Sequence, residues 1–210
     1  MSIMKNYYVL AINGSHRTVP RNTYYLLERI LKPIQKNDNI KTEIINLSKK
    51  NIEYCKSCFT CNRDPCPIND DMPEIYTKML KADAIIIGSP VYIYNVSGRV
   101  KTLFDRCRAL LFRDENLKGK VGAAAAVGFV RNGGAELTVQ AIRNFFDIHQ
   151  MFYAGSVIGI SGQQGGVTKD STAKFFAKAV GKRILDLLNL VEKAKFSDDK
   201  EFIEKIHSKV

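Results

Sequence analysis

The sequence lacks the long apolar stretches that membrane-spanning helices require. No apolar run approaches the ~18 residues that such a helix needs, and the apolar residues 7–13 are not followed by a small-residue cleavage site. A basic block with interleaved aromatics, typical of nucleic-acid binding, is also missing, because the 32 lysines and arginines are dispersed among 21 acidic residues. We therefore expect a soluble, cytoplasmic protein with neither a membrane nor a nucleic acid as its partner. The net charge of +11 suits an acidic redox partner or an anionic cofactor.

The chain alternates short apolar runs with amphipathic segments, which is typical of βαβ units. The expected strands are residues 7–13, 41–47, 83–89, 120–128 and 152–160, and the expected helices are residues 22–36, 72–81, 98–112, 136–149 and 171–193. Because a barrel needs eight such units and more residues, the pattern favours an α/β fold with a flavodoxin-like, doubly wound, five-stranded parallel sheet. We expect one domain over residues 1–193 and a charged C-terminal tail over 194–210, to which we assign no chemistry.

The four alanines of residues 123–126 and the start of the helix over 72–81 have local sequence signals of their own. Residues 123–126 are four consecutive alanines, which have high helix propensity. Because Gly122 and Gly128 bracket a run too short for a helix, we predict a central strand whose small side chains let helices pack close. Asp70 and Asp71, followed by Pro73, predict the start of the helix over 72–81.

Four of the five cysteines lie within twelve residues: Cys55, Cys58, Cys61 and Cys66. Such crowding without an export signal favours metal or redox chemistry over disulfides. Structural zinc sites usually pair two Cys-x2-Cys knuckles across a longer spacer, whereas repeated x2 intervals are typical of thiolates around an iron-sulfur cubane. We therefore predict that all four hold one 4Fe-4S cluster in a loop over residues 54–67, after the second strand, with zinc binding or reactive thiols as alternatives. The isolated Cys107 is expected to be a partly buried small residue.

Polar loops follow the first, third and fourth predicted strands, at the strand ends where open α/β sheets bind ligands. The first loop, residues 14–23, offers backbone amides and polar side chains at a helix N-terminus, which suits a phosphate, although an ordinary capped turn is the alternative. It contains neither Gly-x-Gly-x-x-Gly nor the Gly-Lys of a P-loop. The other two loops, residues 88–95 and 128–134, add proline, tyrosine and paired glycines. Together the three loops predict a mononucleotide site.

Several segments together resemble the archaeal iron-sulfur flavoproteins, which belong to the broader NADPH-dependent FMN reductase group. They are the cysteine run followed by Asp70-Asp71-Met72, the strand from Ala82-Asp83 to Gly88-Ser89-Pro90-Val91-Tyr92, Leu103-Phe104-Asp105-Arg106, Arg131-Asn132-Gly133-Gly134, and His149 to Met151. The resemblance covers residues 7 to about 166, and the cysteine run is its specific part. It implies a flavodoxin-like fold with FMN at the strand ends and one 4Fe-4S cluster in the cysteine loop. It also implies a homotetramer in which a cluster lies close to the FMN of a neighbouring subunit.

The resemblance further implies which residues bind FMN. The residues expected to hold its phosphate are Ser15, Arg17, Asn22 and Thr23; those expected to line the isoalloxazine or ribityl chain are Pro90, Val91, Tyr92 and Asn95; those expected to meet the ring are Gly128, Arg131, Gly133 and Gly134.

Three features depart from the pattern of these relatives. The last cysteine gap, x4, is one residue shorter than usual, which would distort or weaken ligation by Cys66. His16 stands where the family often has proline, which would make the phosphate loop less rigid. Phe129 and Val130 replace small residues and would alter access to the flavin.

The favoured hypothesis is an electron-transfer iron-sulfur flavoprotein, in which the cluster passes single electrons and FMN takes one or two. Reduced ferredoxin is the expected donor and oxygen, peroxide or a quinone-like molecule the expected acceptor. No catalytic side chain is required, and His16, His149 and His207 are expected to be core or surface residues. One alternative is an NAD(P)H-dependent FMN or quinone reductase whose cysteines hold nothing catalytic. Another is a zinc-stabilised interaction module that uses the basic surface.

Overall fold

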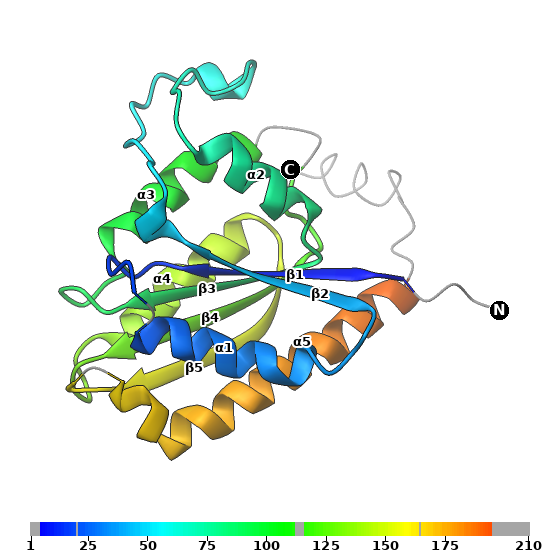
Figure 1. The fold of residues 1–210 in the computed structure, drawn as a ribbon. Coiled ribbons are helices and arrows are strands. Elements are labelled where there is room, and N and C mark those ends of the chain that lie inside the picture. The colour runs from blue at the N-terminus through cyan, green and yellow to red at the C-terminus, as the bar shows by residue number, and fades with distance from the viewer. Residues whose placement is uncertain (1–4, 20, 112–115, 164, 195–210) are drawn as a thin grey trace, which may run out of the picture.

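The computed structural model describes residues 5–19, 21–111, 116–163 and 165–194, so the predicted tail, apart from Ala194, lies outside the described residues. Five parallel strands form one sheet in the order β2-β1-β3-β4-β5 (Figure 1). The strands are β1 (Tyr7–Asn13), β2 (Ile40–Asn46), β3 (Ala84–Pro90), β4 (Val121–Gly128) and β5 (Phe152–Ile160). The helices are α1 (Asn22–Ile34), α2 (Met72–Lys81), α3 (Gly98–Arg106), α4 (Ala135–Ile148) and α5 (Ser171–Ala194), and the 3-10 turns are η1 (Leu47–Lys49), η2 (Thr60–Asn62), η3 (Cys107–Leu110) and η4 (Gly166–Lys169). The strand order is that of flavodoxin-like sheets and confirms the predicted α/β fold.

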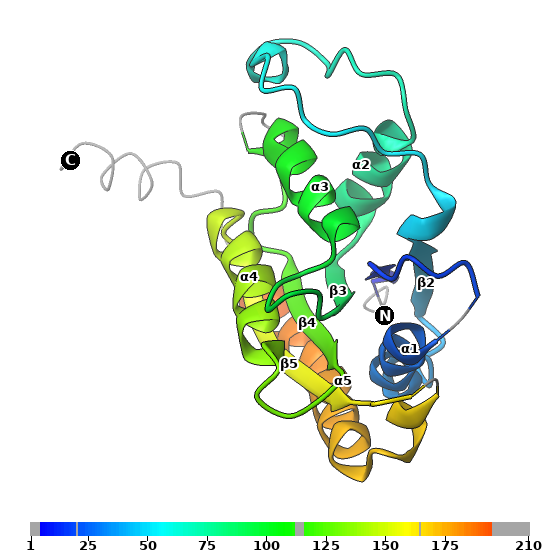
Figure 2. The same cartoon turned by 90° about the vertical axis from the view of Figure 1, so that its left-hand side faces the viewer.

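Each face of the sheet is covered by its own helices. On one face, Val9 and Ile86 pack with residues of α1 and α5. On the other face, the neighbouring strand residues Leu10 and Ile85 pack with residues of α2, α3 and α4. Figures 1 and 2 show these two helical layers on opposite sides of the sheet. Because both faces are buried, the central strands have continuous apolar sequences instead of alternating ones.

The four alanines form the middle of β4, so the strand prediction for residues 123–126 is confirmed. All eight residues of β4 are buried. An added Cβ on Gly122 would lie 2.7 Å from the nearest atom of the Phe146 ring, so α4 packs directly on the strand backbone.

The predicted helix over 98–112 was too long. Helix α3 ends at Arg106 and continues only as the 3-10 turn η3, and residue 112 lies outside the described part of the chain. The hydroxyl of Tyr76 donates a hydrogen bond to the carbonyl oxygen of Arg106 at 2.5 Å, which satisfies a carbonyl at the helix end. Helix α1 similarly ends at Ile34, two residues early, because Asn37 Nδ2 donates to the Ile34 carbonyl oxygen at 2.9 Å.

Residues 50–71 connect η1 to α2 and carry the four clustered cysteines. This segment, cyan in Figure 1, projects from the sheet beyond α2 and α3. Pro73 lies in the first turn of α2, and the Met72 N–H donates to Asp70 Oδ1 at 3.0 Å. Asp71 instead accepts from the Asn51 N–H at 2.7 Å, so the acidic pair that starts α2 also ties the end of the segment to its beginning. Among the described helices, none is long and apolar enough to cross a membrane.

Candidate functional site

A cleft opens at the carboxyl ends of β1, β3 and β4, between the three predicted loops. Its lining includes eight of the predicted residues: Ser15, Arg17, Asn22, Thr23, Pro90, Val91, Tyr92 and Gly128. Four further residues complete it: Arg21, Val127, Phe129 and Ser161. The topology of the sheet therefore gathers segments that are far apart in the sequence into one site, as ligand binding in open α/β sheets requires.

The turn after β1 is packed tightly against α3. The Gly14 N–H donates to the Gly88 carbonyl oxygen at 2.7 Å, and the Ser97 hydroxyl donates to the Gly14 carbonyl oxygen at 2.6 Å. An added Cβ on Gly14 would lie 2.1 Å from Val100 Cγ2, so the turn can approach α3 only because it has no side chain there. The N-terminus of α3 thus fixes where the loop over residues 14–23, expected to hold a phosphate, begins.

The N-terminus of α1 carries buried polar atoms that have no hydrogen-bond partner among the described residues. Asn22 Nδ2 donates to Ser161 Oγ at 2.9 Å and to the Gln163 carbonyl oxygen at 3.0 Å. The other amide atom, Asn22 Oδ1, and Arg21 Nε are buried and unpaired among the described residues. Arg21, the N-cap residue, makes no side-chain bond to the first helical turn. Buried polar groups are rarely left unpaired, and helix N-termini favour anions, so the donor Arg21 Nε fits an anionic group in the cleft, whereas the acceptor Asn22 Oδ1 fits a hydrogen-bond donor.

The loop after β3 forms a strained turn. The Tyr92 N–H donates to the Asn95 carbonyl oxygen at 2.9 Å, and the Asn95 N–H donates back at 3.1 Å. Between them Ile93 and Tyr94 have φ values of 46° and 60°, in the left-handed region that favours glycine. An added Cβ on Gly134 would lie 2.5 Å from Tyr94 Cα, so the loop after β4 packs directly on the turn. Strain of this kind is common at ligand sites.

His16 connects the phosphate loop to this turn. Its ring stacks on Tyr92 with centroids 5.5 Å apart and an interplanar angle of 18°. His16 Nδ1 accepts a hydrogen bond from Arg99 Nε at 3.2 Å, and burial together with the positive charge of Arg99 lowers the pKa of His16. Arg99 Nη1 also donates to the Leu47 carbonyl oxygen at 2.9 Å. One arginine of α3 therefore links the phosphate loop to the chain that leads into the cysteine segment.

Four predicted residues lie outside the lining of the cleft. Asn95 uses its side-chain oxygen to accept from the Val96 N–H at 2.8 Å within the turn. Arg131 lies along a neighbouring groove beside β5. Gly133 and Gly134 pack against the loop backbone and the turn, respectively. Asn95, Gly133 and Gly134 therefore shape the loops beside the cleft, and the predicted contacts of all four residues with FMN stay predictions.

The clustered cysteines differ in burial. Cys55 and Cys58 are exposed, Cys66 is half-buried, and Cys61 is 9% exposed. Hydrogen bonds from the side chain and backbone of the threonine two residues further on lower the pKa of the Cys58 thiol. Cys107 lies apart, fully buried beside α2, and burial raises the pKa of its thiol.

Four thiols on one loop have the donor chemistry of an iron-sulfur cluster. The described residues, however, do not gather three or more His, Cys, Asp or Glu side chains around one point. Ser57 and Phe59 have φ values of 50° and 59°, so the backbone is strained on both sides of Cys58. Binding of a cluster by all four cysteines therefore has to draw this loop together.

Both ends of the cysteine loop are joined by a buried ion pair. Arg106 Nη2 donates to Asp70 Oδ1 at 3.1 Å, and Arg106 Nη1 donates to Asp70 Oδ2 and, at 2.8 Å, to the Glu53 carbonyl oxygen. Asp70 also accepts from the backbone N–H groups of Glu53 and Met72. Burial opposes the charge on Asp70, but the hydrogen bond from Arg106 and those from the backbone hold the pKa of this carboxyl below its usual value. Arg106 Nη2 also donates to Cys66 Sγ at 3.7 Å.

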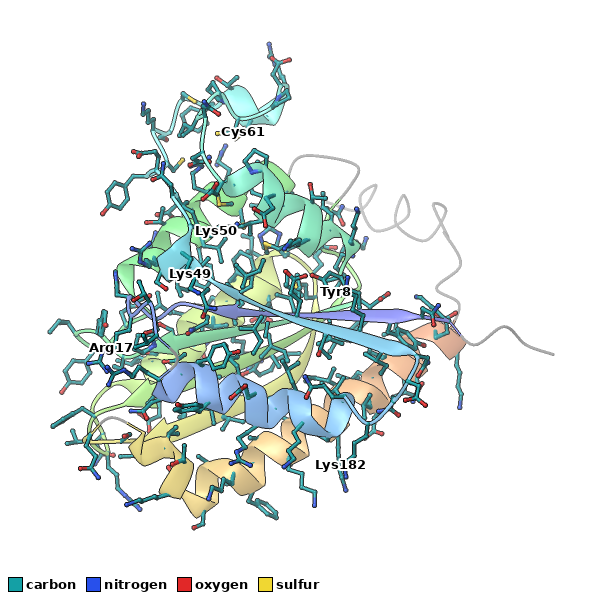
Figure 3. The ribbon with its side chains drawn as sticks, viewed as in Figure 1. Tyr8, Arg17, Lys49, Lys50, Cys61 and Lys182 are labelled. Carbon is teal, nitrogen blue, oxygen red and sulfur yellow. The ribbon has the colours of Figure 1, made fainter. Side chains whose placement is uncertain are left out.

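Figure 3 shows how the cleft and the cysteine loop are related. Arg17 lies at the carboxyl ends of the strands, Cys61 lies on the projecting segment, and Lys49 and Lys50 lie between them. Lys50 forms an ion pair with Glu74 of α2 at 2.5 Å. Two lysines that follow β2 therefore lie between the two candidate sites.

Sequence reasoning missed two sets of residues. Ser161 follows β5 and lines the cleft, where its Oγ accepts a hydrogen bond from Asn22, 139 positions away in the chain. Arg21 carries no N-cap signal in the sequence, because arginine is an unusual N-cap residue. Arg106 and Asp70 were noted in family motifs, but no spacing signal shows that residues 36 positions apart form one pair.

The fold and the cleft define a flavodoxin-like α/β protein with a mononucleotide-type site at the strand ends. Residues 7–166 match the family described as NADPH-dependent FMN reductase. An iron-sulfur flavoprotein of Methanocaldococcus jannaschii is 39% identical over 194 residues, which cover 88% of this chain and 99% of that protein. One of Methanosarcina thermophila is 38% identical over 191 residues, covering 88% and 97%. The chain therefore belongs to the NADPH-dependent FMN reductase family, in the group of the archaeal iron-sulfur flavoproteins, as the resemblance predicted.

Solved structures with low sequence identity share the fold. RosB with a bound 8-demethyl-8-formylriboflavin-5'-phosphate intermediate has a TM-score of 0.78 at 14% identity, covering 97% of this chain and 87% of that one. The NAD(P)H:quinone oxidoreductase of Methanothermobacter marburgensis has a TM-score of 0.60 at 14% identity, covering 88% and 99%. At these identities the likeness supports the flavodoxin-like fold alone.

Proposed function

We propose that this protein is an electron-transfer iron-sulfur flavoprotein, with FMN in the cleft and one 4Fe-4S cluster on the four clustered cysteines. The observation that carries the proposal is the buried donor Arg21 Nε at the N-terminus of α1, which has no hydrogen-bond partner among the described residues and suits the phosphate of FMN. It adjoins a cleft on a protein that also carries four thiols on one loop. The names of the iron-sulfur flavoproteins to which the chain is similar support the same function.

The residues of the cleft suit the two ends of FMN. Arg17 and Arg21 supply positive charge, and Ser15 supplies a hydroxyl that accepts from the Arg17 N–H at 3.2 Å, for the phosphate. Tyr92 and Phe129 supply flat apolar surfaces that exclude water from the ring. When bound, FMN supplies one- or two-electron transfer and the cluster supplies one-electron transfer. The side chains bind and orient these groups, and no proton transfer by a side chain is needed.

The partners of the reaction belong to the same proposal. The net charge of +11 favours an acidic donor, for which reduced ferredoxin has the right chemistry, and the acceptor is a small molecule such as oxygen, peroxide or a quinone. A homotetramer is proposed on the family resemblance, and the 94% exposure of Ile93 on the rim of the cleft is consistent with burial against another subunit.

An anaerobic titration tests the proposed function against its nearest rival. The family match favours, as a second candidate, an NAD(P)H-dependent FMN or quinone reductase. We expect reduced ferredoxin to reduce both centres, seen as flavin bleaching and an EPR signal of the reduced cluster, faster than NADPH does. Rapid bleaching by NADPH without a cluster signal would contradict the proposal and support the reductase.

A further inference from the structure

We propose that Arg106 is a positioning residue for the iron-sulfur site, which holds the Cys66 sulfur through a hydrogen bond and raises the reduction potential of the cluster bound there. This inference rests on the proposed function. The Arg106 side chain would then both close the cysteine loop and tune the reduction potential of the cluster that the loop binds.

The guanidinium of Arg106 is held from three directions. Both of its terminal nitrogens donate to the carboxylate of Asp70, one of them also donates to the Glu53 carbonyl oxygen at 2.8 Å, and the other donates to Cys66 Sγ at 3.7 Å. Because the fork is planar and paired twice with Asp70, the direction of the nitrogen that meets Cys66 is fixed. Glu53 and Asp70 flank the loop, so the same contacts close it.

The pair is deeply buried. The side chain of Arg106 is 1% exposed and that of Asp70 is 0% exposed. Electrostatic interactions are stronger where water is excluded, so the hydrogen bond from Arg106 to Cys66 Sγ is stronger than the same bond would be at the protein surface. Asp70 is itself held by the N–H groups of Glu53 at 2.9 Å and Met72 at 3.0 Å, which keeps the carboxylate in place under the arginine.

The helix that carries Arg106 also fixes the cleft. Helix α3 begins after Ser97, whose hydroxyl donates to the Gly14 carbonyl oxygen at 2.6 Å, and it ends at Arg106. One helix therefore positions both the start of the loop over residues 14–23 and Cys66, the last cysteine of the cysteine loop. A change at Arg106 is expected to disturb the second of these without the first.

The redox effect follows from the charge on the sulfur. A donor aimed at a ligand sulfur, together with a positive charge, stabilises the additional negative charge of the reduced cluster, and so raises the potential. Removing Arg106 alone would also leave Asp70 charged, buried and unpaired, which is strongly destabilising. The test therefore has to remove both charges together.

The decisive variant is the double change Asp70→Asn with Arg106→Gln, compared with Arg106→Lys and with the control double change Asp147→Asn with Arg143→Gln. Arg143 and Asp147 form an exposed ion pair at 3.6 Å, so the control also removes one charge of each sign, but at an exposed site. Each full-length protein is reconstituted anaerobically, assayed for iron, and titrated by EPR. We expect the double variant of Asp70 and Arg106 to fold and bind iron, with the one-electron reduction equilibrium about tenfold less favourable, equal to a fall of about 59 mV.

The iron content and reduction potential of the other proteins distinguish a failure of this inference from a failure of the proposed function. Arg106→Lys keeps a charge but cannot bridge Asp70, Glu53 and Cys66 at once, so we expect a smaller fall in potential and faster loss of iron. Potentials equal to that of the wild type in both Arg106 variants would overturn the inference and leave Arg106 as a counterion for Asp70. A wild-type protein that takes up no iron and sulfide would overturn the proposed function itself. An equal fall in the control double variant would show that the loss of any ion pair lowers the potential, and would overturn the inference.

Discussion

Substituting Gly14 by alanine tests the packing that fixes the phosphate loop. The new Cβ would lie 2.1 Å from Val100 Cγ2 and 2.9 Å from the Gly88 carbonyl oxygen, so the side chain or the turn must move. Overpacking of this kind costs about 2 kcal/mol, which corresponds to a fall in Tm of about 4–8 °C for a chain of this size. Because the loop must shift, we also expect FMN affinity to fall about tenfold, for a loss of about 1.4 kcal/mol of binding free energy.

A double-mutant cycle separates this clash from a general loss of stability. Val100→Ala alone should cost about 2 kcal/mol through lost packing, but in the Gly14→Ala background it removes the closest clash and should cost at least about 1 kcal/mol less. Urea unfolding of the cofactor-free protein measures the four stabilities. Gly98→Ala is the matched control, because the added Cβ would meet no atom of the described residues within 4 Å beyond its chain neighbours and its own helix backbone, and it should be neutral or stabilising. Costs that add to within about 0.5 kcal/mol would refute the clash.

Three further changes have clear expected outcomes. Cys61→Ala should remove iron and sulfide while most FMN stays bound, whereas Cys107→Ala should leave iron unchanged; full iron in the first variant would refute four-cysteine ligation. Asn22→Asp places a negative charge beside the expected phosphate and should weaken FMN binding at least about tenfold in a fluorescence titration, and unchanged affinity would contradict the assigned site. Burial lowers the pKa of His149 from 6.5 to about 4, so the contribution of His149 to stability should be constant above pH 6.5 and fall by up to about 3 kcal/mol as the pH drops to 4. His149→Leu should flatten this profile in urea unfolding, and a profile identical to that of the wild type would show that other groups cause it.

The fold could be predicted because its signals are local. The bounds of β1 and β5 follow directly from apolar runs, and the bracketing glycines identified β4 despite its alanines. The end of α3 could not be predicted, because it depends on a hydrogen bond from Tyr76, which is 30 positions away. Local periodicity carries no information about such contacts.

The candidate site was predicted in part for the same reason. Ser15 and Tyr92 lie on loops that end strands, and sheet topology alone brings such loops together. The expected contact of Arg131 with the same ligand stays a prediction, and this residue lines the groove beside β5. The Arg106–Asp70 pair depends on how the returning cysteine loop meets α3, which becomes visible only in three dimensions.

The most direct test of the central claim is an assay of iron, acid-labile sulfide, zinc and flavin per chain in one anaerobic preparation. The account predicts close to four iron, four sulfide and one FMN, since one cubane and one cleft are proposed per chain. FMN without iron would contradict the cluster assignment and make the NAD(P)H-dependent reductase the leading function. Stoichiometric zinc with neither flavin nor sulfide would contradict both centres.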